Sequence, residues 1–134
     1  MSHLKFFKKI AIITIDFDGT CVRHEFPLTG ETLPNVVKVL KDLTNNGHKL
    51  ILWTVHGSDY IDEAINWFKD NNIKLYGVNM TPGQSVWSDS PKAVSNLYIG
   101  DDALGTPLVY PKDGGRPYVD WGLAEQLLKN IGFI

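Results

Sequence analysis

The sequence predicts an α/β fold, in which a parallel β-sheet is covered by helices on both faces. Short apolar runs alternate along the chain with segments whose apolar residues recur at helical spacing. In addition, polar or acidic residues directly follow several of the apolar runs. The 134 residues suffice for one ordinary domain with its own core, so we expect a single domain over residues 1–134.

Each predicted element has a local signal. The β-branched run at 10–16 predicts a first strand, and a helix follows at 34–46, with Pro34 in its first turn and Gly47 beyond its end. A second strand is expected at 49–54. The next helix runs from Ser58, its expected N-cap, to about residue 71.

The second half continues the alternation. Strands are expected at 74–78, 97–100 and 108–110, and Asp120 is the expected N-cap of a last helix that ends before Gly132. Strands and helices that alternate in this way predict a Rossmann-like sheet of five parallel strands. Such sheets place their functional sites at the carboxyl ends of the strands.

Composition excludes several classes of protein. Hydrophobic residues make up 43% of the chain and charged residues 21%, which is typical of a globular protein, and no apolar stretch is long enough to span a membrane. A formal charge of −2 makes nucleic-acid binding an unfavoured but open alternative. Cys21 is the only cysteine and cannot form an internal disulfide, so we expect a cytoplasmic location.

Two acids follow the first strand. Side chains alternate along a strand, so Asp16 and Asp18 face the same way, with Cα atoms about 7 Å apart. The ends of other strands bring Thr54, Asp101 and Asp102 to the same rim. Carboxylates gathered there repel one another by several kcal/mol per close pair at an effective dielectric of about 20, so a cation is expected. Oxygen ligands favour Mg²⁺.

This set of residues resembles the haloacid dehalogenase-like (HAD) phosphohydrolases. The resemblance covers about residues 10–130 and rests on four motifs in the family's order. They are Asp16-Phe17-Asp18-Gly19-Thr20, the threonine that ends Leu50-Ile51-Leu52-Trp53-Thr54, Lys92, and Ile99-Gly100-Asp101-Asp102. The resemblance implies the strand order 5-4-1-2-3.

The resemblance also implies roles for these residues in a Mg²⁺-dependent phosphatase. Asp16 is expected to attack phosphorus and form an aspartyl phosphate, while Asp18 protonates the leaving oxygen and later activates water. Thr54 is expected to bind phosphoryl oxygens, and Lys92 to neutralise charge on Asp16. Mg²⁺ is expected on Asp16, the backbone carbonyl of Asp18 and Asp101. Asp102 is expected in the outer shell of the metal or as a turn residue.

The chain departs from the family in two respects. Relatives often carry an arginine two residues after the second-motif threonine, whereas this chain has His56, which either contacts substrate or is an ordinary loop histidine. About fourteen residues separate Thr20 from the first helix, so we expect a small flap and no cap domain. The open site then either accepts a bulky phosphoester or is covered by another subunit. Candidates for contacting the leaving group are Arg23, His24, Trp87, Arg116 and Tyr118.

Other functions remain as alternatives to hydrolysis of a phosphorylated small molecule. They are a nucleic-acid end phosphatase and a non-catalytic protein that binds a phosphorylated ligand on the same fold. A receiver domain is disfavoured, because its phosphorylated acid ends the third strand and Gly77-Val78-Asn79 has no carboxylate there. Neither the dinucleotide-binding glycine pattern nor the P-loop pattern is present.

Overall fold

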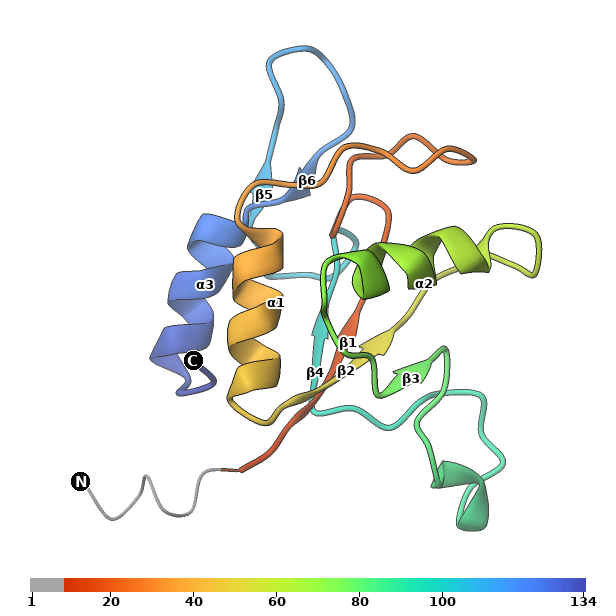
Figure 1. Ribbon diagram of the computed structural model, residues 1–134. Helices are drawn as coiled ribbons and strands as arrows, with labels where there is room; N and C mark the ends of the chain where they lie inside the picture. Colours follow the sequence, from red (N-terminus) through yellow and green to blue (C-terminus); the bar gives the residue numbers. More distant parts are fainter. Residues whose placement is uncertain (1–8) are drawn as a thin grey trace.

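A four-stranded parallel sheet forms the centre of the protein (Figure 1). The computed structural model describes residues 9–134, and in these residues the strand order is β3-β2-β1-β4. The strands are β1 (Ile12–Ile15), β2 (Lys49–Leu52), β3 (Gly77–Val78) and β4 (Leu97–Ile99). The predicted order of these four strands is confirmed.

Three helices follow the predicted positions closely. They are α1 (Val36–Asn45), α2 (Ile61–Asp70) and α3 (Trp121–Asn130). Asp120 caps α3 as predicted, since its side chain accepts a hydrogen bond of 3.1 Å from the amide of Leu123. Ser58 does not cap α2, which begins three residues later, after Tyr60.

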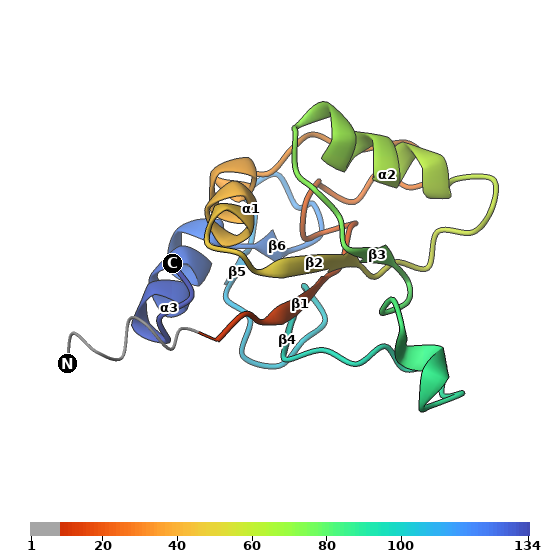
Figure 2. The ribbon, with the colours of Figure 1, turned by 60° about the horizontal axis from the view of Figure 1, so that its bottom comes forward.

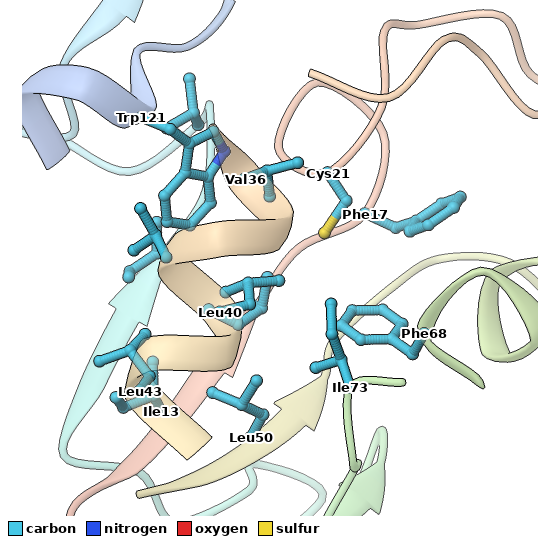
Figure 3. Close-up of a cluster of buried hydrophobic side chains, with 14 of the residues drawn as sticks. Ile13, Phe17, Cys21, Val36, Leu40, Leu43, Leu50, Phe68, Ile73 and Trp121 are labelled. Carbon is cyan, nitrogen blue, oxygen red and sulfur yellow. The ribbon is translucent and has the colours of Figure 1, made fainter. Parts of the chain in front are cut away.

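All three helices pack on one face of the sheet. Ile13 and Ile15 of β1 pair in register with Leu50 and Leu52 of β2, and these four side chains share one buried cluster with residues of all three helices (Figure 3). Figure 2 shows α1 and α2 on the same side of the strands. The prediction of helices on both faces is therefore wrong for the described residues.

The segment 79–96 lies against part of the opposite face. Tyr98 of β4, which pairs with Thr14, points to this face and donates a hydrogen bond of 2.9 Å to the carbonyl of Ala93. The segment contains Pro82, Gly83 and Pro91, which interrupt any helical pattern, and forms only the short 3₁₀ helix η2 (Gln84–Val86).

The predicted fifth parallel strand is also wrong. Residues Leu108–Val109 form β5, which pairs antiparallel with β6 (Tyr118–Val119) in a separate two-stranded sheet. A turn-rich segment between them allows the chain to reverse directly, so β5 pairs with the strand that follows it. Among residues 9–134, no helix combines the length and the apolar character needed to cross a membrane.

Candidate functional site at the carboxyl end of β1

Asp16 stands at the point where β1 ends. Its backbone amide donates a hydrogen bond of 3.1 Å to the carbonyl of Ile99, the last residue of β4. The chain then turns sharply, because the amides of Thr20 and Cys21 both bond to the carbonyl of Phe17, at 3.1 and 2.8 Å. Phe17 points into the core, close to Cys21 (Figure 3). This tight turn keeps the acids at the rim of the sheet.

Thr20 links two of the predicted acidic residues. Its hydroxyl donates to Oδ2 of Asp16 at 3.4 Å and accepts a hydrogen bond of 3.1 Å from the amide of Asp101. The residue is fully buried. The sequence showed Thr20 only as part of the first motif, and its position two residues after Asp18 is the signal that could have identified it.

The environment of Asp16 disfavours its charged form. Burial raises the pKa of Asp16 from 3.8 to about 7, and the adjacent carboxylate of Asp101 adds to this, followed by the charge on Asp102. These contacts place Asp16 and Asp101 together, where the strand ends meet. Asp102 itself is exposed. Burial and the neighbouring acids therefore both disfavour the charged form of Asp16.

His24 reaches Asp101 from the flap that follows the turn. Its Nε2 lies 2.7 Å from Oδ2 of Asp101, whose side chain is only 7% exposed. The approach depends on Gly19, which has φ of 77°, because a Cβ at this position would collide with both Nε2 of His24 and Oδ2 of Asp101. The structure thus places His24 against a proposed metal ligand.

Asp18 is paired with a buried histidine. Its Oδ2 lies 2.5 Å from Nε2 of His56, whose side chain is 1% exposed. The other oxygen, Oδ1, is buried and has no hydrogen-bond partner among the described residues. His56 therefore neither lies in an exposed loop nor offers a surface for substrate. His56 and Asp18 are 38 positions apart in the sequence, and no sequence pattern predicts their contact.

Thr54 and Lys92 do not share the hydrogen bonds that link Asp16 and Asp101. The amide of Thr54 bonds to the side chain of Asn79 at 2.8 Å, and its hydroxyl accepts a hydrogen bond of 3.2 Å from the amide of His56. Lys92 is exposed in the segment 79–96. In residues 9–134, no hydrogen bond or ion pair joins Asp16 to either of these two residues.

The remaining candidates for contacting the leaving group do not lie beside Asp16 and Asp101. Arg23 forms a bidentate ion pair with Asp113, in which its two terminal nitrogens lie 2.9 and 3.0 Å from the carboxylate oxygens. Its guanidinium group lies over the ring of Tyr118. These contacts join the flap to the β5–β6 hairpin. Trp87 and Arg116 are exposed on separate segments.

The donor set at the rim suits a cation that takes few protein ligands. Among the described residues, no three His, Cys, Asp or Glu side chains are arranged to hold a metal ion. Mg²⁺, however, is commonly bound by one or two carboxylates with water and phosphate completing its shell. Asp16 and Asp101 provide two carboxylates that Thr20 links, and burial followed by the nearby Asp101 raises the pKa of Asp16 to about 7. The residues present therefore fit Mg²⁺.

Cys21 takes no part in this chemistry. Burial raises the pKa of its thiol well above the usual value, and the charges of Asp16 and Asp18 add to the effect. The thiol is therefore a packing group.

Asp16 also borders open space. A cavity of about 240 Å³ lies beside it, on the face of the sheet opposite the helices. It is lined by Thr14, Asp16, Trp53, Tyr98, Ile99, Gly100, Asp102 and Ala103. The surface of this cavity is almost entirely apolar, so Asp16 borders it mainly through nonpolar atoms.

Comparison with solved structures finds one described as the structure of a conserved protein from Bacteroides thetaiotaomicron. The two sequences are 34% identical, the match covers 92% of this chain and 93% of the other, and the TM-score is 0.75. No model of a known protein family matches the chain. No curated protein matches it either.

Proposed function

This chain belongs to the same family as the conserved Bacteroides thetaiotaomicron protein, and we propose that it is a Mg²⁺-dependent phosphatase of the HAD type. The observation that carries the proposal is the link from Asp16 through Thr20 to Asp101 at the carboxyl end of β1, where burial, followed by the nearby Asp101, raises the pKa of Asp16 to about 7. A buried carboxyl group with a raised pKa, beside a second acid, suits a site that binds a cation and a phosphoryl group together.

Three groups are proposed to hold the metal: the carboxylates of Asp16 and Asp101 and the backbone carbonyl of Asp18. When bound, Mg²⁺ neutralises these carboxylates and a phosphoryl oxygen. Thr20 and His24 already fix the neighbouring atoms by hydrogen bonds to Asp16 and Asp101. Ligating carboxylates that are themselves hydrogen-bonded keep their orientation.

Phosphoryl transfer is proposed to run in two steps. An oxygen of Asp16 attacks phosphorus, the bond from phosphorus to the ester oxygen breaks, and Asp18 gives that oxygen a proton. Asp18 then takes a proton from water, which attacks the aspartyl phosphate and releases phosphate and free Asp16. Thr54 is proposed to bind phosphoryl oxygens, and Lys92 to place its ammonium near the transferred group after its exposed side chain reorients.

The proposal predicts that Asp16→Asn abolishes phosphate release. Native protein and variant are compared on sugar phosphates, nucleotides, aryl phosphates and oligonucleotides with a terminal phosphate, with Mg²⁺ and with a chelator. The native activity is expected to need Mg²⁺, and the variant to lose more than about 1000-fold, because a covalent nucleophile has been removed.

Asp70→Asn is the matched control, because Asp70 is an exposed aspartate at the end of α2. It should retain native activity. Full turnover by Asp16→Asn would place the nucleophile elsewhere, and release that persists in chelator would exclude the metal. Preference for oligonucleotides, with a steep fall in added salt, would move the substrate to nucleic-acid ends.

A further inference from the structure

His56 is the structural partner of Asp18. The bond between Nε2 of His56 and Oδ2 of Asp18 is the only hydrogen bond to the Asp18 carboxylate from the described residues, because Oδ1 has no partner there. A hydrogen bond of 2.5 Å joins the two atoms whichever of them carries the proton. The orientation of this carboxylate therefore depends on one side chain.

The imidazole of His56 is itself held from several sides. Its Nδ1 lies 3.3 Å from the carbonyl of Tyr60, and its backbone amide bonds to the hydroxyl of Thr54. The rings of Phe17 and Phe26 contact it in edge-on geometry, with centroids 5.6 and 4.9 Å away. A ring enclosed in this way has little freedom to rotate, so it can fix the plane of the carboxylate that it binds.

We propose that His56 is the positioning residue for Asp18, and that it directs the Asp18 carboxyl group toward the oxygen of the leaving group. The inference rests on the proposed function, in which Asp18 is the general acid. Proton delivery needs a defined direction, since a displacement of about 1 Å can lower the rate about 100-fold. His56 itself is too deeply buried to touch substrate.

Leaving groups of different basicity provide the test. An alkyl phosphate needs a proton on its departing oxygen, whereas para-nitrophenyl phosphate departs readily without one. For His56→Ala, kcat/KM for the alkyl phosphate should fall by about 100-fold, the lower end of what a general acid contributes. The fall for the aryl phosphate should be much smaller. This ratio of the two losses distinguishes positioning from a general loss of folded protein, which would lower both values equally.

A double-mutant comparison tests whether His56 acts through Asp18. If it does, His56→Ala combined with Asp18→Asn should be no slower on the alkyl phosphate than Asp18→Asn alone. His56→Gln places an amide nitrogen near the former position of Nε2, so it should recover most of the activity. Additive losses in the double variant would overturn the proposal.

His48→Ala is the matched control, because His48 is as buried as His56, at 4% exposure, but its ring nitrogens bond to backbone atoms of Ala11 and Phe133. It should not change the ratio of the two rates. Equal losses on both substrates in His56→Ala would contradict the inference and leave the phosphatase proposal intact. If native protein releases phosphate from neither probe, the proposed function fails, and the inference with it.

Discussion

At the scale of single residues, the ionisation of Asp16 links stability to function. Its pKa in the folded protein is about 7, compared with 3.8 in an unfolded chain, mainly because the carboxyl group is buried and secondly because Asp101 lies beside it. Between about pH 4 and pH 7 the folded state consequently binds more protons than the unfolded state. Without a cation, the native protein should therefore lose stability as the pH rises through this window.

Asp16→Asn should remove this loss. In chelator at about pH 8 the variant should be more stable than the native protein, by at most about 4 kcal/mol, which is the rise in pKa expressed as free energy. At about pH 4 the two should be nearly equal, because Asp16 is protonated in the folded native protein. Urea denaturation at the two pH values measures both differences.

Mg²⁺ provides the internal control for this measurement. It should raise the stability of the native protein and have less effect on Asp16→Asn, because the variant has lost one of the two carboxylates. A variant less stable than the native protein at about pH 8 would show that the charge on Asp16 is already balanced.

The residues of the site differ in how far sequence could predict them. Asp16 and Asp101 were predictable, because parallel strands end at a common rim and the two residues follow neighbouring strands. The contacts of His24 and His56 were not, since each joins two loops at the rim, with partners 77 and 38 positions apart in the sequence. No periodic pattern encodes the path of such a loop.

At the scale of elements, the turn after β1 depends on the absence of a side chain at Gly19. The residue has a positive φ, and its missing Cβ leaves the space in which His24 meets Asp101. Any substitution at Gly19 is therefore destabilising for two reasons. The positive φ strains the backbone of other residues, and the new Cβ collides with His24 and Asp101.

Gly19→Ala tests whether the collision of the new methyl group costs stability beyond the backbone strain of a positive φ. The variant should lose more than about 1 kcal/mol of stability and most of its activity, because His24 and Asp101 must separate. Gly105→Ala is the control, since Gly105 has φ of 92° and no atom lies within 4 Å of the place that a Cβ would take. Thermal unfolding of both variants should show the larger loss for Gly19→Ala. Similar losses would mean that the turn accommodates a methyl group.

Elements with a repeating apolar pattern were predicted well, and those without one were not. Leu40 and Leu43 of α1 and Ala64 and Phe68 of α2 recur at helical spacing and are buried as that spacing requires. The two residues of β5 have no such pattern. The chain reverses after β5, and β5 therefore pairs with β6. The segment 79–96 likewise lies against part of a face of the sheet, without the periodicity that would reveal it.

At the scale of the whole molecule, α3 supports the acidic turn from the side. The indole nitrogen of Trp121 donates a hydrogen bond of 2.6 Å to the carbonyl of Thr20, and the amide of Val119 bonds to the carbonyl of Gly19 at 2.9 Å. Trp121 is also among the largest fully buried side chains (Figure 3). The C-terminal helix therefore contributes to the geometry of a site at the other end of the sequence.

Trp121→Phe removes the hydrogen bond to the carbonyl of Thr20 while keeping most of the packing of the aromatic ring. It should cost about 1–3 kcal/mol, because the buried carbonyl of Thr20 loses its donor. Urea denaturation measures the loss, and Trp87→Phe serves as the control, since Trp87 is 68% exposed. The activity of the folded Trp121→Phe protein should also fall, through displacement of the Asp16 turn. Unchanged stability would show that water replaces the indole donor without cost.

The bond between Trp121 and Thr20 also matters for biosynthesis, because it joins residues 101 positions apart. A ribosome completes the acidic turn long before it adds Trp121, and contacts so distant in sequence close slowly, after local structure has formed. Until Trp121 emerges, the turn consequently lacks this support. The nascent chain should therefore acquire the native geometry of this turn only after α3 has left the ribosome.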